Sequence, residues 1–255
     1  MGKFSGRTAF VTGGASGIGK AAAIAFAKEG ANVAVVTANS VAKAEALAAE
    51  LKQQYGVEAI GIKCDVRCEA DVEAAVKLTV DTFGSLDFAF NNAGVGPDGV
   101  TIPLGPITEC TESDWDWIMD TNLKGVFLCM KHELRVMQKQ NFGSIVNTSS
   151  TSSLKAMGNF GAYGPSKAGI NYLTKCCAVE NTAFGIRCNV VCPGPTLGTG
   201  MADRMFGKPG ELKPGGPPRF GKPEDIAVVV TGLCSDECSH ITGNIISADG
   251  GLDII

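Results

Sequence analysis

The 255-residue chain has few histidines and no excess of basic residues. Only His132 and His240 are present, too few to supply histidine ligands at each of the three cysteine pairs that are spaced four residues apart. Zinc sites usually combine closer cysteine pairs with histidine, so we expect no metal site. The formal net charge is -4, and such a chain has no basic footprint for nucleic acid.

The chain also lacks an apolar run of about 18 residues, the length that crosses a bilayer, so we expect no membrane association. Residues 1–12 contain no long apolar stretch of the kind found in signal peptides. In a chain of this length, the ten cysteines are expected to be reduced, mostly buried thiols and not a disulfide framework. These features favour a reducing cytoplasm as the compartment.

What the chain does contain is apolar sequence in a regular order. Hydrophobic residues make up 45% of it, which excludes intrinsic disorder. Several strand-like runs, such as residues 32–37, are almost continuously apolar, which is typical of strands buried on both faces. Strands are expected at residues 8–12, 32–37, 59–64, 86–91, 144–148, 186–191 and 244–248, and helices at 18–29, 41–54, 69–83, after 111–114 and from 223. This alternation predicts an α/β fold with a parallel sheet and helices on both faces.

Two further features concern the ends of these elements. Thr111 and Asp114 have the spacing of a capping box before a long helical pattern. Residues 194–221 are rich in glycine, proline and methionine and are too long for an ordinary connection. We therefore expect this segment to form a substrate loop.

A glycine turn follows the first predicted strand. Its sequence, T-G-G-A-S-G-I-G at residues 12–19, leads directly into a helix. Glycines at such a turn let the backbone approach a pyrophosphate, and the helix N-terminus offers free N–H groups to it. The turn predicts a dinucleotide site, although a tight turn without a ligand would use similar residues.

Tyr163 and Lys167 are spaced to project from one face of a predicted helix. A phenol ionises near pH 10, and an adjacent cation would move its pKa toward the working range. Ser150 follows a predicted strand, at the kind of strand end where open α/β sheets bind ligands. Pro165 places the start of the helix near Tyr163, because proline in a helix interior costs about 3 kcal/mol.

Taken in order, these motifs resemble the short-chain dehydrogenase/reductase family, in the branch whose length matches this chain. The resemblance spans nearly the whole sequence: residues 12–19, 91–94, 120–124, Ser150 thirteen residues before Tyr163, the pair Tyr163 and Lys167, Pro193-Gly194, 219–224, 241–243 and 249–251. It implies a single Rossmann-like doubly wound domain over residues 1–255, with about seven parallel strands. It also implies an NAD(P)-dependent alcohol dehydrogenase or ketoreductase.

The resemblance assigns roles to individual residues. Tyr163 would be the general acid/base, and Lys167 would lower its pKa and bind the nicotinamide ribose. Ser150 would polarise the carbonyl, and Asn122 would hold a water in a proton relay. The residues implied in cofactor binding are Gly13, Ser16, Gly17, Ile18, Gly19, Thr37, Asn39, Asp65, Val66, Asn92, Ala93, Gly94, Tyr163, Lys167, Pro193 and Gly194, with Thr196 or Thr199. The last two are alternatives because Gly198 stands where the family usually has threonine.

The choice of cofactor depends on the end of the second predicted strand. An acidic residue there would bind the adenosine 2′-hydroxyl and repel a 2′-phosphate. This chain has T-A-N-S at residues 37–40, without an acid or an arginine. We therefore expect NADP(H) to be favoured, with NAD(H) possible.

Apolar side chains before Tyr163 and after Gly194 predict the substrate. The expected substrate contacts are Ser150, Tyr163, Met157, Met201 and Met205, near Phe160, Leu197 and Phe206. They favour an apolar secondary alcohol or ketone, such as a hydroxysteroid or a cyclic or aryl ketone, although they would also simply pack the loop. A 3-oxoacyl thioester, a sugar or polyol, and a non-catalytic dinucleotide sensor are the alternatives. The resemblance also implies a homotetramer or homodimer, with helices near Phe127 and Tyr163 at one interface.

Overall fold

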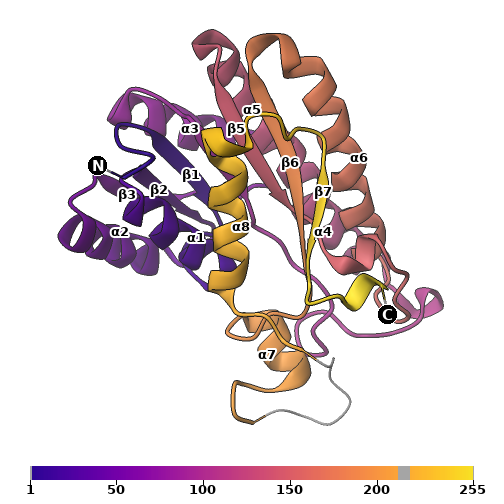
Figure 1. Ribbon diagram of the computed structural model, residues 1–255. Helices are drawn as coiled ribbons and strands as arrows, with labels where there is room; N and C mark the ends of the chain where they lie inside the picture. The colour runs from indigo at the N-terminus through magenta and orange to yellow at the C-terminus, as the bar shows by residue number, and fades with distance from the viewer. Residues whose placement is uncertain (1, 212–218, 255) are drawn as a thin grey trace.

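The computed structural model describes residues 2–211 and 219–254. Within these residues, seven parallel strands form one sheet in the order β3-β2-β1-β4-β5-β6-β7 (Figure 1). The strands are β1 (Thr8–Thr12), β2 (Asn32–Thr37), β3 (Ala59–Lys63), β4 (Phe88–Asn91), β5 (Gly143–Thr148), β6 (Ile186–Pro193) and β7 (Ile245–Ala248). The strand order changes direction between β1 and β4, which makes the sheet doubly wound and confirms the predicted fold class.

Helices cover both faces of the sheet (Figure 1). One layer holds α1 (Gly17–Lys28), α2 (Val41–Tyr55) and α8 (Pro223–Cys234), and the other holds α3 (Glu69–Phe83), α5 (Gly125–Gln140) and α6 (Tyr163–Asn181). Phe26 and Val230 pack in the first core, and Met137 and Ile170 in the second. All residues of β1 and β5 are buried, as expected of central strands of a parallel sheet, and β5 buries the polar residues Ser144, Asn147 and Thr148 as well.

The helical pattern after Thr111 differs from the expected single helix. Thr111 is the N-cap of α4 (Glu112–Met119), and its hydroxyl accepts from the Asp114 N–H at 3.1 Å, as the capping box predicted. A π-helical turn, Asp120–Lys124, then separates α4 from α5. The apolar periodicity does not encode this wider turn, because the i→i+5 bonds depend on contacts made elsewhere in the fold.

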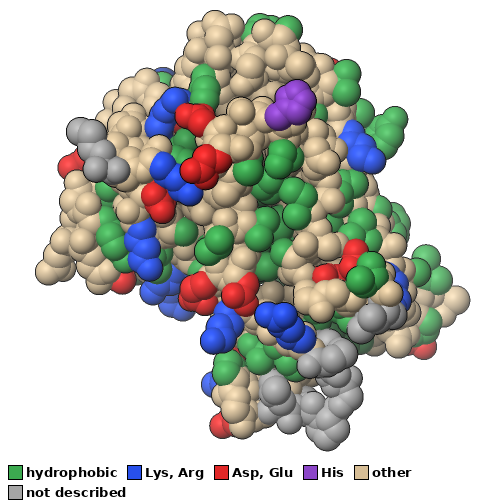
Figure 2. Space-filling model, viewed as in Figure 1, with side chains coloured by type: hydrophobic (Ala, Val, Ile, Leu, Met, Phe, Trp, Pro, Cys, Tyr) green, Lys and Arg blue, Asp and Glu red, His purple; other side chains and the backbone are tan. Residues whose placement is uncertain are grey.

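The expected substrate loop contains a short helix, α7 (Gly200–Phe206), which lies below the sheet in the view of Figure 1. Residues 212–218 of this loop lie outside the described residues. In the space-filling view, acidic and basic side chains are interspersed on the face that carries α8 (Figure 2). Within the described ranges, no helix combines the length and apolar character needed to cross a membrane.

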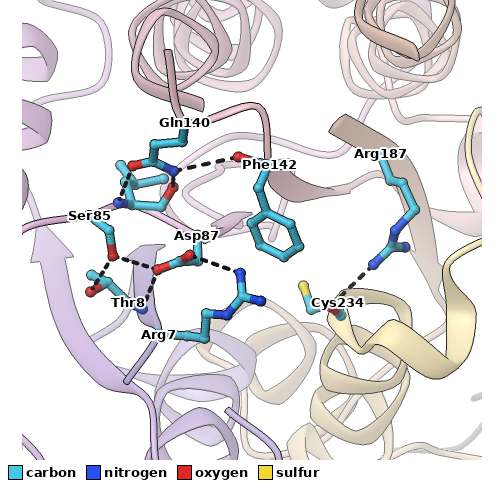
Figure 3. Close-up of polar contacts among 9 residues, drawn as sticks. Arg7, Thr8, Ser85, Asp87, Gln140, Phe142, Arg187 and Cys234 are labelled. Atoms are coloured by element: carbon cyan, nitrogen blue, oxygen red, sulfur yellow. Dashed lines mark hydrogen bonds and ion pairs between the residues drawn. The ribbon is translucent and has the colours of Figure 1, made fainter. Parts of the chain in front are cut away.

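Polar contacts fasten the amino ends of the strands (Figure 3). Asp87, just before β4, accepts from the Thr8 N–H at 2.9 Å and from Arg7 Nη1 at 3.1 Å. Arg187, at the start of β6, donates to the carbonyl oxygens of Cys234 and Ser235 at 3.1 Å each, where α8 ends. A cation at a helix C-terminus stabilises the helix dipole. This end of the sheet is therefore tied together by side chains, and the site described next lies at the opposite end.

Candidate active site

A cavity of about 310 Å³ opens at the carboxyl ends of β1, β4, β5 and β6. In an open α/β sheet this edge, beside the change in strand direction, is where ligands bind. The sequence-predicted residues that line it are Gly13, Ser16, Gly17, Ile18, Asn92, Ala93, Gly94, Ser150, Met157, Tyr163, Lys167, Pro193, Gly194, Thr196, Thr199, Met201 and Met205. The fold thus brings together motifs that are up to 192 residues apart in the sequence, Gly13 and Met205 being the two extremes.

Six predicted residues lie outside the lining: Gly19, Thr37, Asn39, Asp65, Val66 and Asn122. Thr37 ends β2, and its register partner Lys63 ends β3, so Asn39 and Asp65 follow neighbouring strands. The hydrogen bond from Arg67 Nε to Asp65, 2.9 Å long, lowers the pKa of the Asp65 carboxyl. Thr37, Asn39 and Asp65 therefore lie at the carboxyl edge of the sheet, outside the lining of the cavity.

The glycine turn has the geometry that its composition predicts. Gly17 has a φ of +51°, which favours glycine, and a Cβ at Gly19 would lie 2.2 Å from the carbonyl oxygen of Gly13. The Thr12 hydroxyl accepts from the backbone N–H groups of Asn92 at 2.9 Å and Ala93 at 3.1 Å. The turn is thereby held against the end of β4, and its bare backbone beside the N-terminus of α1 fits a pyrophosphate.

Tyr163 is the first residue of α6, and Lys167 follows one helical turn later. Pro165 lies in the first turn, as expected from the cost of proline in a helix interior. Both functional side chains are buried, and Lys167 Nζ lies 5.6 Å from the centroid of the Tyr163 ring. The expected common face of the two side chains is confirmed. Lys167 Nζ donates to the backbone carbonyl of Thr148, at the end of β5, over 2.9 Å.

The pKa of Tyr163 shifts in the direction opposite to the one expected. Burial raises the pKa of the Tyr163 phenol, and the hydrogen bond with Ser150 opposes part of this increase. Burial also lowers the pKa of Lys167 to about 8. The loss of hydration therefore dominates the pKa of the Tyr163 phenol in this structure, and the expected lowering by Lys167 stays a prediction.

The two adjacent serines after β5, Ser149 and Ser150, make different side-chain contacts. Both line the cavity, but only Ser150 lowers the pKa of the Tyr163 phenol. The Ser149 hydroxyl donates to the backbone carbonyl of Lys167 at 2.9 Å, and its oxygen lies 3.0 Å from Ser153 Oγ. The geometry therefore agrees with the spacing argument that selects Ser150 over Ser149.

Asn122 is fully buried behind the cavity wall, in the π-helical turn. Its Oδ1 atom accepts from the Val95 N–H at 2.8 Å, and its Nδ2 atom donates to the Val95 carbonyl at 2.8 Å and to Ser166 Oγ at 3.1 Å. A Cβ at Gly94 would lie 3.1 Å from Asn122 Oδ1 and 3.4 Å from Lys167 Nζ. Asn122 thus holds the backbone after β4 in place, close to Lys167.

Asp98 connects the segment after β4 to α7 through an ion pair with Arg204. This buried carboxylate accepts from the N–H groups of Val100 at 2.8 Å and Thr101 at 2.6 Å, and it pairs with Arg204 of α7 at 2.6 Å. Burial alone would raise the pKa of Asp98, but the backbone donors of residues 100–102 and then Arg204 outweigh it and hold the pKa at about 2. The ion pair fixes α7 where Met201 and Met205 line the cavity.

Sequence reasoning missed several residues that the fold places at the cavity. Val95, Thr148, Ser152, Pro195 and Leu252 all contribute to its lining. Thr148 acts through its backbone carbonyl, for which no sequence signal exists. Ser152 stands in a run of serines, and only its position one turn from Ser150 could have marked it.

Comparisons with known proteins agree over the length of the chain. Residues 13–253 match the family described as enoyl-(acyl carrier protein) reductase. The short chain dehydrogenase/reductase astE of Aspergillus oryzae is 40% identical over 99% of this chain and 98% of that protein. The 3-oxoacyl-(acyl-carrier-protein) reductase FabG of Staphylococcus aureus is 40% identical over 96% of this chain and 98% of that protein.

Two solved structures have the same fold. The crystal structure of levodione reductase aligns with a TM-score of 0.87 at 33% identity, covering 98% of each chain. The crystal structure of NAD⁺-bound xylitol dehydrogenase aligns with a TM-score of 0.87 at 33% identity, covering 96% of this chain and 98% of that one. At this identity and coverage the likeness extends beyond the sheet to the whole arrangement of helices.

Proposed function

Because the chain belongs to the short-chain dehydrogenase/reductase family of oxidoreductases, we propose that it interconverts an apolar secondary alcohol and its ketone with NADP(H). The main support for this proposal is that three side chains lie together in one cavity. Ser150, Tyr163 and Lys167 lie along one cavity whose lining also includes the glycine turn. Residues that can donate a proton, stabilise an oxyanion and hold a dinucleotide thus line one cavity.

The bare backbone of the glycine turn, Asn92 to Gly94 and Pro193-Gly194 would hold the dinucleotide, and Lys167 would bind its ribose. When bound, the nicotinamide ring supplies the hydride for ketone reduction or accepts it in alcohol oxidation. Thr196 and Thr199 both line the cavity, and one of the two would contact the ring.

The chain's own residues handle the proton. In reduction, Tyr163 donates its phenolic proton to the carbonyl oxygen, and in oxidation the phenolate takes the proton from the alcohol. Ser150 donates a hydrogen bond to the same oxygen and stabilises its developing charge. The Lys167 ammonium favours the phenolate, and Asn122 would hold the water that returns the proton.

The end of β2 supports the preference for NADP(H). Thr37 carries no charge, and Asn39 is exposed beside it. Asp65, which follows the neighbouring strand, is paired with Arg67, which offsets its negative charge. The test is kcat/KM with NADPH and NADH for one ketone. A higher value with NADPH is expected, and an equal or lower value would count against the preference.

The substrate end of the cavity supports an apolar substrate. Met157, Phe160, Met201, Met205 and Phe206 line it. A panel of cyclic ketones, aryl ketones, steroid ketones, sugars and 3-oxoacyl thioesters tests this proposal. We expect the highest kcat/KM for a cyclic, aryl or steroid ketone, and activity confined to sugars would contradict it.

A 3-oxoacyl thioester is the second candidate substrate. It is favoured by one observation, the 40% identity to the Staphylococcus aureus 3-oxoacyl-(acyl-carrier-protein) reductase. A sensor without turnover is disfavoured by the presence of Ser150, Tyr163 and Lys167 together. Turnover of any ketone in the panel would exclude the sensor.

We also propose a homotetramer, with a homodimer as the alternative. Apolar side chains on α5 and α6 support it: Phe127 is 45% exposed, Tyr172 73% and Val179 80%. Light scattering on the purified protein measures the mass directly, and a monomer would contradict the proposal. The ten free thiols fit a reducing compartment, and we propose the cytoplasm.

A further inference from the structure

Ser152 lies directly beside the catalytic serine. It belongs to a short 3-10 turn, Thr151–Ser153, that follows β5, and it is buried in the cavity wall. Its hydroxyl donates to Ser150 Oγ at 2.9 Å, and its backbone N–H donates to the same oxygen at 3.2 Å. Ser150 Oγ is therefore the acceptor of two hydrogen bonds from one residue.

These two bonds restrict the direction of the Ser150 proton. A serine hydroxyl has two acceptor lone pairs and one proton. With both lone pairs occupied by Ser152, the oxygen can take part in a third hydrogen bond only as the donor. Ser150 and Tyr163 line the same cavity, and Ser150 lowers the pKa of the phenol, which is the effect of a hydroxyl that donates toward the phenol oxygen. The three side chains form a chain of donors that runs from Ser152 through Ser150 to Tyr163.

We propose that Ser152 is a positioning residue that holds the Ser150 hydroxyl as a donor toward the reacting oxygen. This inference rests on the proposed function, because it concerns the same proton transfer. Hydrogen bonds in such a chain polarise one another, so the donor at Ser150 is stronger than an isolated serine. In the reaction, Ser152 stabilises negative charge on the phenolate or the substrate oxygen without touching either.

Ser153 offers a matched comparison in the same turn. Its hydroxyl donates to the Ser150 backbone carbonyl at 2.6 Å and accepts from Asn171 Nδ2 at 2.9 Å. It is bonded to the backbone of Ser150 and not to its hydroxyl. Replacing Ser153 with alanine therefore disturbs the turn while leaving both bonds from Ser152 to Ser150 Oγ in place.

The experiment compares Ser152→Ala, Ser152→Thr and Ser153→Ala with the wild-type chain. The readout is the pH profile of kcat/KM for oxidation of the alcohol that wild type oxidises fastest, with cofactor Kd from fluorescence titration. For Ser152→Ala we expect kcat to fall about three- to tenfold, the worth of one hydrogen bond, with cofactor Kd unchanged. The acidic limb of the profile should move to higher pH, because the phenolate has lost a stabilising donor.

Two further results are expected from the comparison variants. Ser152→Thr retains the hydroxyl, so the acidic limb of its pH profile should lie at the wild-type pH. Ser153→Ala should lower the Tm without moving the limb. The inference would be overturned if the acidic limb of the pH profile of Ser152→Ala stayed at the wild-type pH, or if the limb of Ser153→Ala moved by the same amount. Either result would leave the proposed function intact. Failure of wild type to oxidise or reduce anything in the panel would overturn both.

Discussion

Lys167 Nζ lies 5.6 Å from the Tyr163 ring centroid and is bonded to the Thr148 carbonyl, not to the phenol oxygen. The cation therefore acts on the phenol through space. Because burial holds the pKa of Lys167 at about 8, the side chain is an ammonium below that pH and loses its charge above it. The neighbour that opposes the raised pKa of the buried Tyr163 phenol is Ser150.

Changing Thr37 to Asp should reverse the cofactor preference. Thr37 ends β2, and its hydroxyl accepts from the Ser40 N–H at 3.4 Å, a bond that a carboxylate can also make. A negative charge there repels a 2′-phosphate, so kcat/KM with NADPH should fall roughly tenfold to a hundredfold while the value with NADH is retained or rises. Thr37→Asn is the uncharged control of similar size. Equal losses in the two variants would show that charge is not the cause.

Glu133 should make the stability of the protein fall as the pH rises. This side chain of α5 is fully buried, and burial raises its pKa to about 8, although the bond from Asn91 Nδ2 at 3.0 Å opposes the shift. Between the unfolded pKa of 4.5 and about 8, the folded chain keeps a proton that the unfolded chain releases. Stability contributed by Glu133 is thus complete below pH 4.5 and is lost as the pH rises through 8, at up to about 1.4 kcal/mol per unit.

Glu133→Gln should remove this dependence. Urea unfolding at pH 5.5, 7 and 8.5 is expected to give a flatter free-energy profile for the variant than for wild type. Glu180→Gln makes the same change at an exposed position of α6 and serves as the control. Parallel profiles for wild type and Glu133→Gln would contradict the assignment.

Breaking the pair between Asp98 and Arg204 should loosen α7. In Asp98→Asn the amide oxygen can still accept from the backbone N–H groups of residues 100–102, but the charge that holds Arg204 is gone. We expect KM for the ketone to rise several-fold and the Tm to fall. Arg204→Met should raise KM similarly, and an unchanged KM in both variants would rule out a role for the pair in shaping the cavity.

The stability difference between wild type and Asp98→Asn should also depend on pH, in a direction set by the lowered pKa of Asp98. The pKa of Asp98 is about 2 in the folded chain, below its ordinary value of 3.8, so its stabilisation is present above about pH 4. It is lost as the pH falls through 2. The difference in unfolding free energy between wild type and Asp98→Asn should therefore shrink between pH 4 and pH 2, as measured by denaturant unfolding.

The local signals in the sequence predicted most of the fold. Strands 8–12 and 32–37 and helix 69–83 have the predicted bounds, because buried strands are continuously apolar and Gly84 ends α3 in the left-handed conformation. Strand 86–91 begins later than predicted, at Phe88. Leu86 is buried, but its N–H bonds to the Gln140 side chain and not to a neighbouring strand.

The sequence predicted which residues form the site, but it did not predict their hydrogen-bond partners or their pKa shifts. Spacing selected Ser150, Tyr163 and Lys167, because helix and strand periodicity fix which side chains share a face. Three features depend on contacts between distant segments: the π-helical turn at Asn122, the carbonyl of Thr148 as partner of Lys167, and the raised pKa of Tyr163. Burial and backbone partners of this kind arise only when the strands have assembled.

The most direct measurement is the turnover and cofactor affinity of Tyr163→Phe. Removing the phenolic hydroxyl deletes the proton donor but leaves the glycine turn, Lys167 and the packing of the ring. NADPH is expected to bind with unchanged Kd in a fluorescence titration, while kcat falls by roughly 10²–10⁴. Turnover within tenfold of wild type, with the variant folded and the cofactor bound, would contradict the assignment of Tyr163 as the acid and base.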